Sequence, residues 1–238
     1  MTEIKHTFYL KSKKEQNHIQ LMISSVATAV NIGVLLVSYL LGFYLLSIFF
    51  IALTLTVIAP FFDTPSLVRN GKLFYYSPLF LAENEKRGVI TVHGGTLFDY
   101  VFVINRKLNG KQRTRLIIRS YLDGLLQLLE EHREENSKDI KIKGTSYVLN
   151  ERTASKIGLK RTRTSFSQAL LLIFNYVHLI ISYSFSKARL SFPSLANINT
   201  YEAEIGELQT RKAYLIKLRD SLASASNSSS SMSNAGRG

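Results

Sequence analysis

The longest apolar segment of the chain lies near its N-terminus. Residues 23–62 form a dense apolar run of forty residues without Lys, Arg, Asp or Glu. At about 1.5 Å per residue, one continuous helix over this run would be roughly 60 Å long, twice the ~30 Å hydrocarbon core of a bilayer. Two helices over about 21–41 and 43–62, joined near Gly42, match that thickness. The pattern therefore predicts a transmembrane helical hairpin within residues 18–62.

Basic residues flank both ends of this predicted hairpin. Lys11, Lys13 and Lys14 precede the first helix, and Arg69 and Lys72 follow the second. Both ends of a hairpin lie on one side of the membrane, and basic flanks favour the cytoplasmic side. The alternative, a secretory signal peptide, has an apolar region of only about 7–15 residues. We therefore expect an integral membrane protein, in a bacterial inner membrane, with both termini and the following domain in the cytoplasm.

A basic tail over residues 1–17 precedes the hairpin, and shorter apolar patterns after it predict a small mixed α/β domain over residues 63–164. Runs of β-branched and aromatic residues predict strands, and apolar residues at helical spacing predict helices. The expected elements are strands at 88–93 and 100–105, a helix at 111–131, a strand at 139–149 with a bulge at Gly144, a helix at 151–157 and a strand at 159–164. The expected fold class is a membrane-anchored α+β protein with further helices at its C-terminus.

Three segments follow the predicted domain. Residues 169–185 are apolar with one polar stripe and basic flanks, and a full crossing would place one basic flank on the wrong side of the membrane. We expect a helix over 165–187 that lies in the interface or packs between domain and hairpin, with a third crossing as the alternative. Residues 188–224 predict a charged helix, in which apolar residues at seven-residue steps over 201–222 favour weak self-association. The Ser-rich residues 225–238 predict disorder.

The charge of the chain favours an anionic partner. Its 30 Lys and Arg residues against 17 Asp and Glu residues give a net charge of +13. Anionic lipid headgroups, a phosphorylated small molecule or nucleic acid would each suit this charge. The membrane anchor favours lipid, and no helix-turn-helix or RRM signature supports nucleic acid. The chain has no cysteine, and its 5 histidines lack ligand spacing, so we expect neither thiolate chemistry nor a metal site.

The most site-like motif is His93-Gly94-Gly95-Thr96, followed closely by Asp99. A histidine at the end of an apolar strand can serve as a general base, and a nearby carboxylate can orient its ring. The catalytic hypothesis therefore assigns His93 as the base and Asp99 as its orienting partner. The alternative is a Gly-rich turn with a hydrogen-bonded histidine.

A second set of residues suits an anion or phosphate group. Cations at a helix N-terminus oppose the helix macrodipole, so a bound anion would offset the cost of placing them there. An exposed, solvated basic face is the alternative interpretation. The residues of this set are Arg106, Lys111, Arg113, Arg115 and Asn150.

Residues 101–164 resemble the second half of the GNAT N-acetyltransferase superfamily. The resemblance rests on Arg106–Thr114 (RKLNGKQRT) and Asn150–Lys160 (NERTASKIGLK). In that family a strand leads into a Gly- and Arg-containing loop that holds the acetyl-CoA pyrophosphate at a helix N-terminus, and a strand, a helix and a closing strand follow. This chain keeps only Gly110 of the family's loop glycines. The resemblance implies an acyl-CoA substrate.

Three functions are compatible with these patterns. The first is a membrane-anchored accessory or scaffold protein, without a cofactor, whose basic domain contacts anionic lipid or a partner protein. The second is an acyltransferase-like enzyme that uses acyl-CoA at the membrane surface, and the third is a membrane-tethered nucleic-acid binder. The enzyme hypothesis predicts that Lys111, Arg113 and Arg115 converge with His93 on one pocket. A binding protein would instead spread these charges over a surface.

Overall fold

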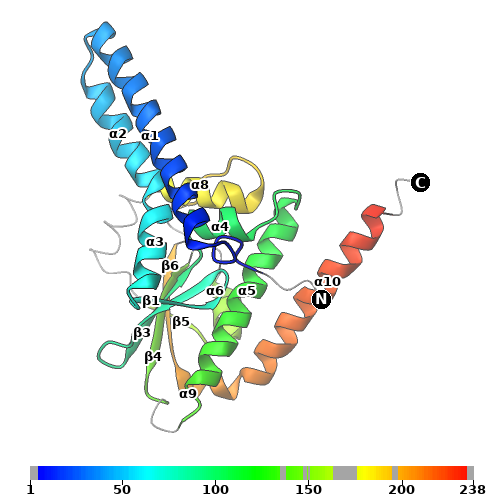
Figure 1. The fold of residues 1–238 in the computed structure, drawn as a ribbon. Helices are drawn as coiled ribbons and strands as arrows, with labels where there is room; N and C mark the ends of the chain where they lie inside the picture. Colours follow the sequence, from blue (N-terminus) through cyan, green and yellow to red (C-terminus); the bar gives the residue numbers. More distant parts are fainter. Residues whose placement is uncertain are drawn as a thin grey trace.

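The computed structural model describes residues 5–134, 138–146, 149, 151–162, 176–194 and 198–234. The helices are α1 (Lys13–Leu41), α2 (Leu45–Ile58), α3 (Pro60–Arg69), α4 (Leu97–Val103), α5 (Gly110–Glu131), α6 (Glu151–Lys156), α8 (Tyr176–Lys187), α9 (Ile205–Thr210) and α10 (Lys212–Asn234). The strands are β1 (Leu73–Ser77), β2 (Phe80–Glu83), β3 (Val89–Gly94), β4 (Lys141–Ser146), β5 (Lys160–Thr162) and β6 (Asn199–Glu204). Figure 1 shows a helical pair that projects from a mixed α/β domain.

Helices α1 and α2 lie side by side and run in opposite directions (Figure 1). Ser12 caps α1 by accepting a hydrogen bond from the Glu15 amide, and Gly42 ends the helix with φ 67°, a left-handed conformation that glycine adopts without strain. By length and composition, α1 can cross a membrane. The pair α2 and α3, bent by 40°, meets the same criterion if it is counted as one span.

The sheet has the strand order β1-β2-β3-β4-β6-β5. Among the described strands, β3 and β4 form a parallel pair, and the other neighbours are antiparallel. Pairing between β3 and β4 ends at Val92 and Gly144. Beyond that point β3 stays paired with β2 up to Gly94, and β4 stays paired with β6 up to Ser146. The sheet is therefore split at the carboxyl ends of its two parallel strands.

Helices α4 and α5 connect β3 to β4. Helices α5 and α9 pack on the sheet, and α10 packs on α5. Gly124 of α5 allows a close approach, because a Cβ atom there would lie 2.6 Å from the ring of Phe80. The buried core between these elements is aliphatic and aromatic, and burial of such side chains is the main driving force for folding. Its members include Phe80, Ile90, Leu128, Leu129, Ile142, Ile205, Leu208 and Leu215.

The region before α5 differs from the sequence-based expectation in two ways. Residues 100–105, expected as a strand, belong largely to helix α4, and residues 73–83, for which no strand was predicted, form β1 and β2. The prediction failed at α4 because Thr96 and Asp99 cap a helix start, which overrides the β-branched composition. The bulge expected at Gly144 is also absent, since the β4–β6 register runs through it without a shift.

The C-terminal prediction is corrected as well. Tyr201 lies in strand β6, while Leu208 and Leu215 are fully buried in the core of their own domain. The seven-residue spacing over 201–222 thus reflects packing within this chain, and these residues are not free for a coiled coil. Helix α10 continues to Asn234, through Ser-rich residues for which composition predicts disorder. Helix propagation from a packed start is easier than nucleation, which accounts for this extension.

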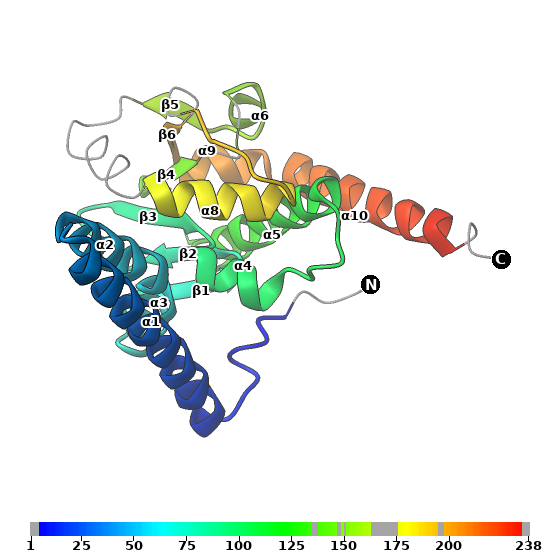
Figure 2. The same ribbon diagram turned by 90° about the horizontal axis from the view of Figure 1, so that it is seen from above.

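Helix α8 contains the described part of the third apolar segment; residues 163–175, and with them most of its N-terminal half, lie outside the described residues. The helix packs on α4 and α5 and also contacts α2. Its polar stripe faces inward, since Ser182 and Ser186 are buried. Figure 2 shows α8 between the α1–α2 pair and α5, which is the arrangement expected of a helix packed between domain and hairpin.

Candidate functional site

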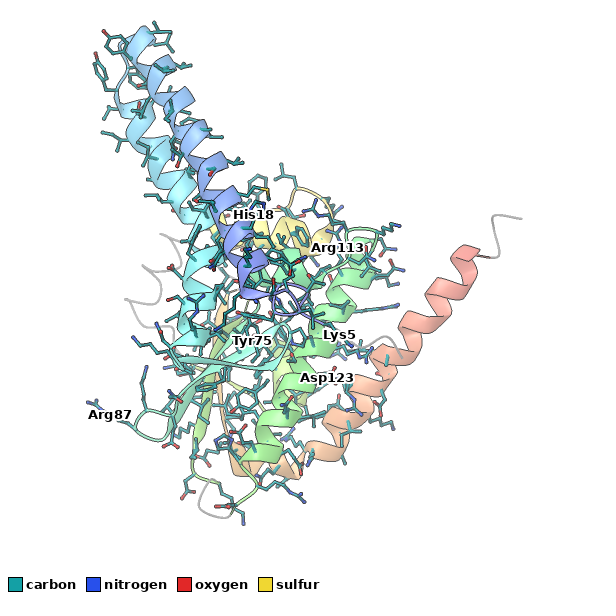
Figure 3. All side chains as sticks on the ribbon, viewed as in Figure 1. Lys5, His18, Tyr75, Arg87, Arg113 and Asp123 are labelled. Carbon is teal, nitrogen blue, oxygen red and sulfur yellow. The ribbon has the colours of Figure 1, made fainter. Side chains whose placement is uncertain are left out.

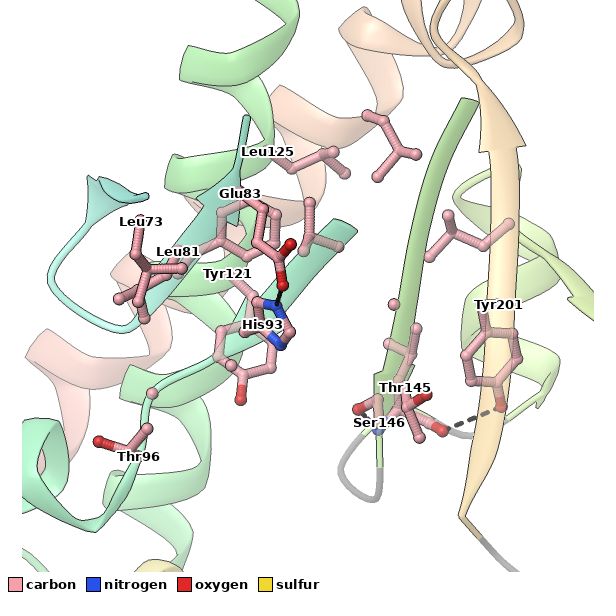
Figure 4. A pocket seen from close by; sticks show the side chains of 18 of the residues that line it. Leu73, Leu81, Glu83, His93, Thr96, Tyr121, Leu125, Thr145, Ser146 and Tyr201 are labelled. Atoms are coloured by element: carbon pink, nitrogen blue, oxygen red, sulfur yellow. Dashed lines mark hydrogen bonds and ion pairs between the residues drawn. The ribbon is translucent and has the colours of Figure 1, made fainter. Parts of the chain in front are cut away.

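A cavity of about 760 Å³ lies where β3 and β4 separate. Figure 4 shows its two sides, with β2 and β3 on one and β4 and β6 on the other. This volume lies within the range of roughly 300–1,000 Å³ that is usual for small-molecule sites. Helices α3, α5 and α8, with single residues of α6 and α10, complete the wall, which is largely apolar. Its apolar residues include Leu73, Val92, Ile118, Leu125, Ile142 and Leu179.

His93 lines this cavity at the end of β3 (Figure 4). Its Nε2 lies 3.0 Å from Oε1 of Glu83, on the neighbouring strand β2, and Lys86 donates to the other oxygen of Glu83 at 2.9 Å. Partial burial raises the pKa of Glu83, but hydrogen bonds from Lys86 and His93 outweigh it, so that the pKa lies below its ordinary value. An ionised carboxylate therefore orients the imidazole. The partner is Glu83 and not the Asp99 that the motif suggested.

Asp99 is fully buried and belongs to a separate cluster. Its Oδ2 accepts hydrogen bonds from the amide of Thr96 at 2.6 Å and from the hydroxyl of Thr96 at 2.9 Å. Its Oδ1 accepts from the hydroxyl of Tyr75 and lies 3.1 Å from Nε2 of His6. Burial, followed by the charge of Asp99, raises the pKa of Tyr75, which is labelled in Figure 3. Asp99 thus joins the N-terminal segment, β1 and α4, and has no contact with His93.

Arg113 is a structural residue and not an anion ligand. Only 8% of its surface is exposed, and its guanidinium donates to the carbonyl oxygens of Leu108 at 2.8 Å, Phe185 at 2.7 Å and Arg106 at 2.7 Å. It also lies 4.9 Å from the centre of the Phe185 ring. Figure 3 shows its place near the start of α5, beside α8. Its donors therefore fasten the loop before α5 to α8.

The other predicted anion ligands do not converge on the cavity either. Arg106 and Lys111 are exposed and Arg115 is partly buried, and none of them lines the cavity wall. Asn150 lies outside the described residues. The start of α5 is already occupied, since Asn109 accepts from the Gln112 amide at 3.0 Å and Lys187 of α8 packs against Gly110. The convergence of cations and His93 expected of an enzyme is therefore not observed among the described residues.

Polar groups that the sequence did not indicate also face the cavity. The hydroxyl of Tyr201 donates to the carbonyl of Leu149 at 3.1 Å. Nε2 of His178 accepts from the amide of Leu97 at 3.4 Å, and burial lowers the pKa of His178, so its imidazole is neutral at pH 7. Glu83 escaped detection because its strand was not predicted. His178 belongs to the polar stripe of its helix, and that stripe was the signal that could have indicated it.

The arrangement combines an apolar volume with an oriented imidazole on its wall. Such a site can hold an apolar ligand and accept a proton from a group that lies beside His93. Among the described residues, no cluster of His, Asp and Glu could hold a metal ion. No protein-family model, curated protein or solved structure matches this chain. The geometry of the cavity is therefore the basis for assigning a function.

Proposed function

We propose that this protein is a membrane-anchored enzyme that transfers an acyl group from a thioester donor, such as an acyl-CoA, to an acceptor at the membrane surface. In this proposal the cavity holds the acyl chain, and Lys111, Arg113 and Arg115, which do not line it, take no part in binding the donor. The cavity between the separated ends of β3 and β4, with His93 on its wall, is the observation that carries the proposal. Ligands of open sheets bind beyond the carboxyl ends of parallel strands, and this cavity occupies that position.

Exposure of the projecting helices supports the anchor. Only 6% of the most apolar 18-residue segment of α1 is buried, whereas the core helix of a water-soluble domain would be mostly buried. The outward-facing side chains include Leu36, Leu40 and Phe49. Covering them with lipid removes this apolar surface from water, at about 25 cal/mol per Å². We place α1, and α2 together with the start of α3, across the bilayer, with basic residues around the start of α1 and at the end of α3 and with the α/β domain at the cytoplasmic face.

The composition of the wall supports an acyl-chain ligand. Val92, Ile118 and Leu179 bring apolar side chains from β3, α5 and α8 to the same space. From β3 to β5 the elements run β3, α4, α5, β4, α6 and β5. Helix α4 stands directly before the loop at Arg106–Thr114, where the GNAT resemblance implies a strand, so the order of elements matches the one implied only from α5 to β5.

The proposed step uses His93 as general base and Glu83 as a positioning residue. Nδ1 of His93 takes a proton from an amine or hydroxyl of the acceptor, since Nε2 faces Glu83. The acceptor atom forms a bond to the acyl carbon while the carbon–sulfur bond breaks. The proton then passes from His93 to the departing thiolate, so the products are the acylated acceptor and free coenzyme A.

A thiol-release assay tests this proposal directly. The chain has no cysteine, so a thiol reagent detects only coenzyme A freed by the reaction. The full-length protein in nanodiscs would be titrated with acyl-CoAs of increasing chain length, with simple amines and membrane lipids as acceptors. We expect binding that strengthens with chain length, and a fall in thiol release of about 10²–10³-fold in His93→Ala.

The matched control for this assay is His18→Ala, because His18 is an exposed histidine outside the cavity. This variant should release thiol at the rate of the unmodified protein. Absence of acyl-CoA binding at every chain length would overturn the proposal. Equal activity in His93→Ala and His18→Ala would remove His93 from the mechanism.

A second candidate function is a non-catalytic protein that contacts anionic lipid. It is favoured by Arg106 and Lys111, which are exposed on the surface and do not line the cavity. In this case Arg106→Gln/Lys111→Gln would weaken binding of the domain surface to phosphatidylglycerol bilayers. Acyl-CoA would then have no effect on thermal stability, which separates this candidate from the enzyme.

A further inference from the structure

The turn after α8 presents two large apolar side chains to the outside. Leu190 is 75% exposed and Phe192 is 66% exposed, and the cations Lys187 and Arg189 lie beside them in sequence. Figure 1 shows this turn, in yellow, at the end of the domain from which α1 and α2 project. Its parent helix α8 contacts α2 directly. The turn therefore lies on the side of the domain from which the helices that we place in the membrane project, after the end of α8 that packs on the start of α5.

Hydrogen bonds hold this turn in a defined conformation. The hydroxyl of Ser184 donates to the carbonyl of Ser191 at 3.1 Å and accepts from the Ser191 amide at 2.9 Å. Tyr176 fixes the far end by donating to the carbonyl of Pro193 at 3.1 Å. Ala188 has φ 53°, an unfavourable conformation for a residue with a side chain. Because these hydrogen bonds hold the turn in one conformation, the side chains of Leu190 and Phe192 remain exposed.

We propose that Leu190 and Phe192 insert into the headgroup–acyl boundary of the bilayer that holds α1 and α2. The inference rests on the anchored arrangement in the proposed function. A lipid surface is the partner that fits, because apolar tips flanked by cations match acyl chains beneath anionic headgroups. The turn also lies on the side of the domain from which α1 and α2 project, which is the side that faces the bilayer in the anchored arrangement.

Insertion of this turn would also determine how close the cavity lies to the bilayer. Helix α8 supplies His178, Leu179 and Ser182 to the cavity wall, and the inserted turn follows the same helix directly. The turn would therefore hold this wall close to the lipid surface. An acyl chain could then pass between bilayer and cavity over a short path.

Tryptophan reporters can test the insertion, because the chain contains no tryptophan. Four full-length variants, Phe192→Trp, Leu190→Trp, Phe49→Trp and Tyr214→Trp, would be placed in bilayers of phosphatidylcholine and phosphatidylglycerol with bromine on the acyl chains. Phe49 lies in α2 and reports on the anchor. Tyr214 lies in the first turn of α10, close to α9 at the end of the domain away from the hairpin (Figure 1), and serves as the matched control.

We expect bromine near the headgroups to quench Phe192→Trp and Leu190→Trp, bromine deep in the chains to quench Phe49→Trp, and neither to quench Tyr214→Trp. Quenching of Phe49→Trp without quenching of either turn reporter would overturn the inference and leave the anchor intact. Failure to quench Phe49→Trp would overturn the anchor and the inference together. The use of two reporters in the turn guards against a local effect of either substitution.

Discussion

The protein contains two histidine–carboxylate pairs of nearly equal length and opposite surroundings. His6 and Asp99 are 3.1 Å apart with side chains 7% and 0% exposed, whereas His93 and Glu83 are 3.0 Å apart with side chains 45% and 32% exposed. The acceptor sites of Asp99 are filled by groups from three segments of the chain. The His93 pair faces a cavity. A short distance between imidazole and carboxylate therefore does not identify a site, whereas the access of the imidazole to a ligand does.

The largest expected effect on stability comes from a substitution in the buried pair of His6 and Asp99. Asp99→Asn removes the charge that Thr96, Tyr75 and His6 share, and should lower the free energy of unfolding by about 3 kcal/mol. Chemical denaturation of the detergent-solubilised protein measures this change. Asp139→Asn, at an exposed carboxylate, is the control and should change stability by less than about 0.5 kcal/mol. A similar small change in Asp99→Asn would show that the cluster is not a structural clamp.

The same contrast between buried and exposed groups separates two cations of α5, Arg113, which is buried, and Lys111, which is exposed. Arg113→Met leaves the carbonyls of Arg106, Leu108 and Phe185 without a donor, and should cost about 2 kcal/mol of unfolding free energy. Lys111→Met, two residues away and exposed, should be nearly neutral. The midpoints of urea denaturation compare the two variants. Equal midpoints would contradict the structural role of Arg113.

A substitution in the partly exposed pair of His93 and Glu83 should change activity more than stability. Glu83→Gln weakens the orientation of His93 and should reduce thiol release about tenfold, with a stability change below about 1 kcal/mol, as for partly exposed ion pairs. Denaturation and the thiol assay on one preparation measure both quantities. A loss of stability as large as that of Asp99→Asn, with activity retained, would reverse the assignment of the two pairs.

The smallest expected effect is a pH dependence due to His178. Burial lowers the pKa of His178 in the folded state below its ordinary value of 6.5, so the unfolded chain binds the proton first as the pH falls. This contribution to stability should therefore be complete above pH 6.5 and decrease on acidification below it. Thermal melts across this window would show the slope, and His178→Gln should reduce it. An unchanged slope in the variant would assign the dependence to another group.

Several elements could be predicted from sequence because their patterns are local. The helix at α5 and the strands β3, β4 and β5 follow from periodicity and composition, and α1 follows from its long apolar run. Helix α4 could not be recognised from composition, since Tyr100–Val103 is β-branched and aromatic. Its start signal, Thr96 followed three residues later by Asp99, is present, but the same Asp99 also suits the role of an orienting partner for His93.

The site was predictable only in part, because its partners are set by tertiary structure. His93 was found from its place between an apolar strand and two glycines. Glu83 is its partner through the antiparallel β2–β3 pairing, in which Leu81 lies opposite His93. His178 reaches the cavity through the packing of α8 on α4 and α5. None of these contacts follows from residue spacing along the chain.

Photo-crosslinking tests most directly whether the cavity holds an acyl chain. A long-chain acyl-CoA with a diazirine near the chain terminus would be irradiated with the full-length protein in nanodiscs, and the modified peptides would be identified by mass spectrometry. We predict adducts on cavity-lining residues such as Val92, Tyr121 and Leu179, and their loss in the presence of excess unlabelled acyl-CoA. Adducts confined to α1 and α2, unaffected by the competitor, would contradict the account.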